Sequence, residues 1–190
     1  MKGNWKAGAV LSGFAMLLSA SVWARQQSKS EQKTAPAKQQ SAEMARLNFY
    51  LGEWDYTETY LKSAAFPNGG QNTGIYMSKA GPGGNSLVNS FHSHGPVGDF
   101  EGLLVMTWDP REKCYKMYAF GGDLPGALEE TGQFEGDALV YHIEMKMGTK
   151  SMKLRNVTRL AAPGKIVSEQ FAAQGDGPET LMVHVEATKR

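Results

Sequence analysis

The chain has 190 residues, of which 41% are hydrophobic and 21% are charged, and its formal net charge is +1. A single cysteine, Cys114, excludes an intramolecular disulfide, so the fold depends on its hydrophobic core alone. Residues 41–190 carry 14 basic and 18 acidic side chains, and this balance argues against a nucleic-acid partner, which requires a clustered basic face.

The first segment, residues 1–24, has the three parts of a secretory signal peptide. Lys2 and Lys6 give a positive start, residues 7–20 are apolar, and the Val-Trp-Ala run at 22–24 suits a cleavage site. The apolar stretch is short for a membrane-spanning helix, which needs roughly 20 residues. We therefore predict a cleaved signal peptide, a periplasmic or secreted protein and no transmembrane segment after cleavage. The alternative is an uncleaved anchor.

Residues 25–40 contain no aromatic or large aliphatic side chain. Such a segment cannot bury enough apolar surface to offset the entropy lost on ordering, so we predict a disordered linker. Its four basic residues and one acidic residue leave two interpretations open, a solvated spacer or a contact with an anionic lipid or cell-wall polymer.

One helix is predicted, over residues 41–51. Ser41 can cap it, Glu43 places a negative charge in the first turn, and apolar residues follow at helical spacing. Gly52 then ends it. In a small barrel such a helix would close one open end.

From Glu53 to Arg190, apolar and polar residues alternate in short segments separated by turn signals such as Pro67-Asn68-Gly69-Gly70 and Gly136-Asp137. Ten strands are predicted, over residues 53–62, 73–79, 86–94, 100–108, 113–121, 127–134, 138–147, 151–160, 166–173 and 180–188. Short connections favour antiparallel pairing of consecutive strands, and closure removes exposed sheet edges. The fold class predicted for residues 41–190 is therefore all-β, an up-and-down antiparallel β-barrel in one domain.

Five short motifs, in this order and at this spacing, resemble a bacterial family, the domain of unknown function 1579. They are LGEW at 51–54, FEG at 100–102, WDPREKCY at 108–115, RNVTR at 155–159 and EATKR at 186–190. The resemblance spans residues 45–190. It implies the calycin-like barrel of lipocalins, fatty-acid-binding proteins and nitrobindins, whose Gly-x-Trp opening is similar to residues 52–54, with a central cavity for a small and mostly apolar molecule. It implies no reaction.

Histidines are the first candidate site residues. His92 and His94 would place two imidazoles on one strand face roughly 7 Å apart, close enough to share a metal ion. His184 has a second interpretation, because nitrobindins ligate haem through a histidine on the last strand. Glu186 stands where their ending has a second histidine, and the alternation around His184 turns its side chain outward.

Aromatic and basic side chains are the second set of candidates. Trp54, Tyr56 and Tyr60 share one face of the first strand, where they would form core, a ligand contact or both. Arg155 and Arg159 share a face of the eighth strand. They either lie in solvent or, if they point inward, form a carboxylate clamp.

The sequence therefore predicts an exported barrel that binds a small apolar or amphipathic molecule and needs no cofactor. No nucleophile elbow, zinc-protease helix or phosphate-binding loop is present in the sequence, so an enzyme is the less favoured interpretation. Two alternatives stay open. One is a metal-dependent enzyme or haem-binding barrel using His92, His94 or His184, and the other is a solid barrel that acts as a protein interaction module.

Overall fold

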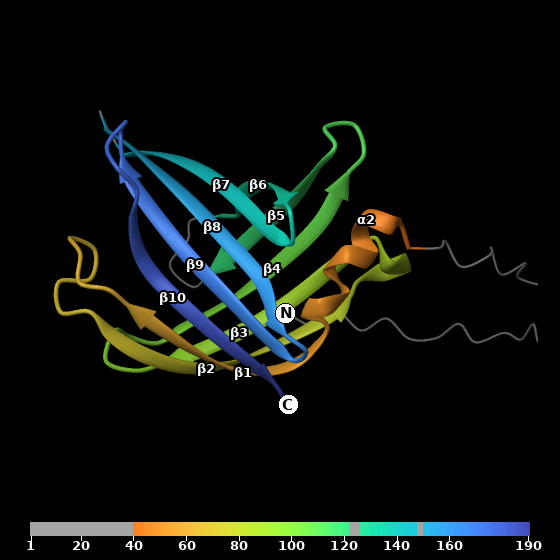
Figure 1. Ribbon diagram of the computed structural model, residues 1–190, viewed down its shortest axis with the longest axis horizontal. Coiled ribbons are helices and arrows are strands. Elements are labelled where there is room, and N and C mark those ends of the chain that lie inside the picture. Colours follow the sequence, from red (N-terminus) through yellow and green to blue (C-terminus); the bar gives the residue numbers. More distant parts are fainter. Residues whose placement is uncertain (1–39, 122–125, 148–149) are drawn as a thin grey trace, which may run out of the picture. The chain divides into compact units, whose positions relative to one another are not determined.

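Ten antiparallel strands close into a barrel (Figure 1). The computed structural model describes residues 40–121, 126–147 and 150–190, so the predicted signal peptide and residues 25–39 of the predicted linker lie outside the described residues. The strands are β1 (Gly52–Tyr60), β2 (Gly70–Ala80), β3 (Ser86–His94), β4 (Phe100–Asp109), β5 (Cys114–Gly121), β6 (Leu128–Glu135), β7 (Ala138–Met147), β8 (Lys150–Ala162), β9 (Lys165–Gln174) and β10 (Thr180–Lys189). Each strand pairs with its neighbours in sequence, and β1 pairs with β10 to close the sheet. The predicted fold class is confirmed.

Alternation along each strand decides which side chains enter the barrel. In β7, Leu139, Tyr141 and Ile143 are buried, while His142 and Glu144 on the other face are exposed. This is the orientation that the sequence predicts, because successive side chains of a strand point to opposite faces of the sheet. The barrel interior therefore collects one residue in two from every strand.

The predicted helix is present but is only partly α-helical. α2 (Ala42–Ala45) is a single turn, which Ser41 caps by accepting a hydrogen bond from the Met44 backbone N–H at 3.1 Å. It continues as a 3-10 helix, η1 (Arg46–Tyr50). Met44, Leu47 and Tyr50 are buried at intervals of three residues, the spacing that aligns side chains on one face of a 3-10 helix. The core contact thus explains the tighter winding.

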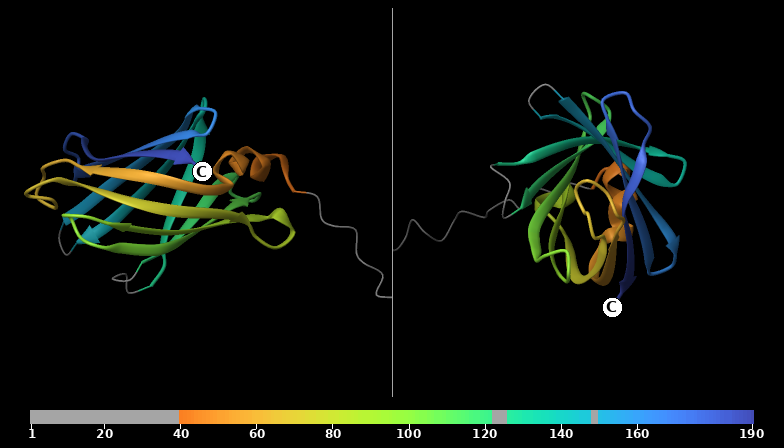
Figure 2. Two further views of the ribbon diagram at one scale, coloured as in Figure 1. Left: turned by 90° about the horizontal axis from the view of Figure 1, so that it is seen from below. Right: turned by 90° about the vertical axis from the view of Figure 1, so that its left-hand side faces the viewer.

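The helical segment lies at one end of the barrel (Figure 2). Its three buried residues belong to the same hydrophobic cluster as Trp54 and Leu139 from the barrel interior. The segment therefore closes that end, as the sequence predicts. In the described residues, no helix combines the length and the apolar character needed to cross a membrane.

The strands β2 and β8 extend beyond their predicted bounds. β2 begins at Gly70, where it pairs with Tyr60, and includes Asn72, which interrupts the apolar alternation. Asn72 is fully buried because its amide donates to the Gly98 carbonyl at 2.8 Å and accepts from the Val97 N–H at 3.3 Å. A satisfied polar residue can occupy an interior position, so polarity alone misplaced this strand start.

Candidate functional site

The barrel encloses a cavity of about 360 Å³ that is partly open to solvent. Its wall is mostly apolar and aromatic, with a small number of polar groups. The lining residues are Tyr50, Tyr56, Glu58, Tyr60, Phe66, Tyr76, Asn89, Phe91, Leu104, Met106, Met117, Glu130, Tyr141, Asn156, Thr158, Ile166, Ser168, Glu169, Gln170, Val183, Val185 and Ala187. Small-molecule sites in proteins measure about 300–1,000 Å³ and have this mixture of residues.

Tyr50 forms the end of the cavity nearest the helical segment. It is the last residue of η1, and its backbone carbonyl accepts a hydrogen bond from the Trp54 indole N–H at 2.8 Å. The Trp54 ring stacks on Tyr76, with centroids 5.6 Å apart. Trp54 is 1% exposed and is absent from the cavity wall, so it holds Tyr50 and Tyr76 in place from behind.

Three aromatic rings of the cavity wall lie across from glycines on the neighbouring strand. The register pairs Tyr56 with Gly74, Phe91 with Gly102, and Tyr141 with Gly132. At each glycine a Cβ would come within 2.7 Å of the opposite ring or closer. Real Cβ atoms do not approach other atoms so closely. The absent side chains therefore let the rings lie flat against the sheet and leave the centre of the barrel free.

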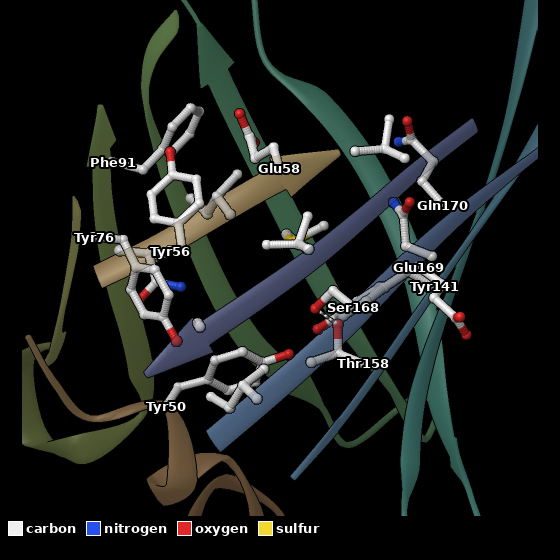
Figure 3. Close-up of a pocket in the computed structure, with 18 of the residues that line it drawn as sticks. Tyr50, Tyr56, Glu58, Tyr76, Phe91, Tyr141, Thr158, Ser168, Glu169 and Gln170 are labelled. Carbon is white, nitrogen blue, oxygen red and sulfur yellow. Dashed lines mark hydrogen bonds between the residues drawn. The ribbon is translucent and has the colours of Figure 1, made fainter. Parts of the chain in front are cut away.

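The hydroxyl groups of Tyr56, Tyr76 and Tyr141 are buried without a hydrogen-bond partner among the described residues. Burial of an unpaired hydroxyl costs stability, and most buried polar groups in proteins have partners. All three residues line the cavity. Figure 3 shows Tyr56 and Tyr76 on one side of it, and Tyr141, Thr158 and Ser168 on the other. The cavity thus presents three hydroxyl groups that a bound molecule can satisfy.

Glu130, on β6, is an acidic side chain inside the barrel. It is 5% exposed, and its carboxyl accepts a hydrogen bond from the Asn156 amide at 2.8 Å. Burial raises the pKa of this carboxyl from 4.5 to about 7, because a buried charge loses its hydration; the bond from Asn156 opposes the shift but is weaker. The group therefore changes charge near neutral pH.

Glu58 is the second acid of the cavity wall, on β1. Its Oε2 atom accepts hydrogen bonds from the hydroxyls of Tyr60 and Ser93, each at 2.9 Å. Burial, and secondarily the charge of Glu58, raise the pKa of Tyr56 to about 12 and that of Tyr60 further. Both phenols therefore stay neutral over the physiological range.

Of the three aromatic residues predicted to contact a ligand, two line the cavity and one lies behind its wall. Tyr56 and Tyr60 line the cavity, whereas Trp54 lies behind it. Tyr60 also packs edge-on against Phe66, with ring centroids 4.6 Å apart, and this brings the β1–β2 connection over the wall.

Arg155 and Arg159 lie on the outer face of β8. Arg155 binds Glu179 through two nitrogens, at 2.5 and 3.0 Å, and lies over the Phe171 ring at 4.3 Å; Arg159 is 3.4 Å from Glu169. Asn156 and Thr158, which alternate with them, line the cavity. The carboxylate clamp required both arginines to point inward, and strand alternation instead directs them to solvent. Of the two interpretations of these arginines, the structure has the solvent-facing one, and the condition for a clamp is not met.

The candidate histidines also lie outside the cavity. His92 and His94 are exposed on the outer face of β3, with ring centroids 6.0 Å apart. His184 lies 3.6 Å from Glu169 and 3.4 Å from Glu186, on the opposite face from Val183 and Val185, which line the cavity. An interior haem does not fit this position of His184. No group of three metal-ligating side chains occurs in the part of the chain that the structure describes.

Sequence reasoning did not select Glu130, Asn156, Tyr76 or Tyr141 as site residues. A signal for Glu130 was present, because it shares a strand face with Leu128 and Phe134. A carboxyl on an otherwise apolar face is costly unless it is paired, and it marks a candidate site.

Of the comparisons with known proteins, the one with solved structures found a match, and it bears on the fold alone. No family model matches the chain. No curated protein matches it either. Among solved structures, the chain is similar to the crystal structure of Rv2717c from M. tuberculosis, at 9% sequence identity and a TM-score of 0.56, over 80% of this chain and 99% of that chain. Identity this low shows a shared barrel fold only.

Proposed function

We propose that this protein is an exported carrier or receptor that binds a small amphipathic molecule in the barrel cavity and catalyses no reaction. The cavity itself carries the proposal: about 360 Å³ inside the barrel, with an aromatic wall and three unpartnered hydroxyls. Mostly apolar walls with a few fixed polar groups suit a molecule that has an apolar body and a polar group.

The alternatives have less support from the geometry. A solid interaction module would fill its interior with its own side chains, and this barrel leaves a cavity. A haem inside the barrel would require His184 to face the interior, whereas its side chain lies on the outer face. For a metal enzyme, no third metal-ligating side chain joins His92 and His94 among the described residues.

We also propose that the chain belongs to the domain-of-unknown-function family 1579 and has a calycin-like barrel. The order and spacing of its five motifs support this, and so does the closed ten-strand barrel. A solved family member with the same strand order and an end-closing helical segment would add support, and a member with a different topology would contradict the assignment.

Native mass spectrometry of the protein purified from its source tests both export and binding. We expect a chain that begins near Arg25, because the predicted signal peptide has been removed, together with a second species heavier by one small molecule. The adduct should dissociate on denaturation. A chain that keeps residues 1–24 would contradict a cleaved signal peptide, and a protein that carries no adduct and binds no small amphiphile in vitro would contradict the proposed function.

A further inference from the structure

The cavity wall is rich in aromatic faces. Five tyrosines and two phenylalanines line it. Aromatic faces carry partial negative charge and attract cations, most strongly where water is excluded. The unpartnered hydroxyls of Tyr56, Tyr76 and Tyr141 can also accept hydrogen bonds from a donor on a bound molecule.

The charges of the wall have one sign. Among the lining residues that the structure describes, the ionisable groups other than tyrosine are Glu58, Glu130 and Glu169, and none is lysine, arginine or histidine. The Glu169 carboxylate pairs with Arg159 and His184, whose side chains lie on the outer face. An anionic ligand would therefore enter a buried site with no cation to pair with it, which is strongly unfavourable.

The two remaining acids, Glu58 and Glu130, differ in how many hydrogen bonds their carboxyl groups accept from the protein. Glu58 accepts hydrogen bonds from two hydroxyls. Glu130 is more buried, and among the described residues Asn156 alone donates to it. Glu130 is also close enough to Tyr141 for its charge to raise the pKa of that phenol, after the larger effect of burial. Glu130 therefore has the greater unmet capacity for a positively charged donor.

We propose that the ligand is an organic amine, whose ammonium group pairs with Glu130 inside the aromatic wall while its apolar part fills the rest of the cavity. This inference rests on the proposed function, because it names the chemical class of the molecule bound there. The ammonium would donate to the carboxylate and to unpartnered phenol oxygens, and the rings would provide cation–π attraction.

The test compares three probes that share one chain and differ in the head group: n-octylamine, n-octanol and n-octanoate. Binding to the full mature protein is measured by titration calorimetry at about pH 8, where the amine is protonated and octanoate is ionised. The variants are Glu130→Gln and a matched control, Glu129→Gln. Glu129 is the adjacent residue on β6 and its exposed carboxylate lies 3.0 Å from Lys116 on the outer face.

Octylamine should bind the wild type at least tenfold more tightly than octanoate. Glu130→Gln should weaken octylamine binding at least tenfold and affect octanol binding far less, and Glu129→Gln should change neither. Circular dichroism and thermal unfolding verify that both variants are folded.

Two results would overturn the inference: octanoate binding as tightly as octylamine, or octylamine binding that Glu130→Gln does not weaken. If octanol or octanoate binds and the amine has no advantage, the inference fails while the proposed function stands. If none of the three probes binds, the inference fails, and the proposed function fails with it when native mass spectrometry also finds no adduct.

Discussion

At the level of single residues, Glu130 is a buried acid that lowers the stability of the folded barrel. Its carboxyl is buried and receives one hydrogen bond, from Asn156, among the described residues. Natural proteins keep such unfavourable groups where binding requires them, and replacing them commonly stabilises the fold. Because the pKa of Glu130 is raised in the folded protein, its effect on stability depends on pH.

Glu130→Gln should stabilise the protein at alkaline pH. Below about pH 4.5 the folded and unfolded chains both hold the proton, so the substitution changes little. Between pH 4.5 and about 7 the unfolded chain releases its proton while the folded chain keeps it, so the wild type loses stability as the pH rises. Above about pH 7 the variant should be more stable by up to about 3 kcal/mol, from 1.36 kcal/mol per pKa unit.

Urea unfolding of the ligand-free protein at a series of pH values measures this difference. Glu129→Gln is the control, since that carboxylate is exposed and its stability curve should follow the wild type. A difference between Glu130→Gln and wild type that is constant with pH would contradict the raised pKa.

At the scale of the strand, the cavity depends on glycine facing an aromatic ring. Gly74, Gly102 and Gly132 lie on three different strands, and each pairs with an aromatic residue of the cavity wall. Glycine within a strand weakens it and often marks a close approach of another group. Here that group is an aromatic ring, and the arrangement widens the interior.

Gly132→Ala should destabilise the barrel by roughly 1–3 kcal/mol, the usual cost of overpacking. The added Cβ would lie 2.5 Å from Cδ1 of Tyr141 and 2.6 Å from the Val140 carbonyl oxygen, and the latter is backbone that cannot move aside. Thermal unfolding measures the effect. Gly126→Ala is the control, because a Cβ there meets no atom within 4 Å. Equal stability of the two variants would contradict the role of Gly132.

Alternation predicted the strands and most of their faces from sequence because burial repeats every second residue. It was uninformative for β3, where the interior positions include the polar Asn89 and Ser93, so the faces of His92 and His94 could not be assigned. Asn89 and Ser93 are satisfied by contacts with Ser78 and Glu58, which lie on other strands. Which residues become such partners depends on the register between strands, and that register is known only once the sheet has folded.

The 3-10 winding of η1 could not be predicted either, and the central cavity was expected only from the family resemblance, not from the residues themselves. Five apolar residues between 44 and 51 fit an α-helical stripe, and the three-residue spacing of Met44, Leu47 and Tyr50 becomes decisive only against the barrel. Whether a barrel is hollow depends on the summed volume of all inward side chains. The free volume also depends on which aromatic rings lie over glycines of the neighbouring strand, and the sequence alone does not give these cross-strand pairs.

At the scale of the whole molecule, the barrel separates two sets of polar groups. Arginines and histidines that suggested a site lie on the outer surface, where Arg155 and His184 pair with neighbouring acids. The interior keeps hydroxyls and carboxyls around an open centre. The similarity to Rv2717c at 9% identity shows that a similar barrel fold can be built from a very different sequence, so the function of this chain has to be argued from its own interior residues.

The most direct test of the account is to fill the cavity and leave its exterior unchanged. Leu104 lines the cavity, and Leu103, its neighbour on β4, is exposed on the outer face. We predict that Leu104→Trp, once shown to be folded by circular dichroism, binds n-octylamine and n-octanol at least tenfold more weakly than the wild type in titration calorimetry. Leu103→Trp should bind both as the wild type does. Equal binding by the two folded variants would contradict a ligand site inside the barrel.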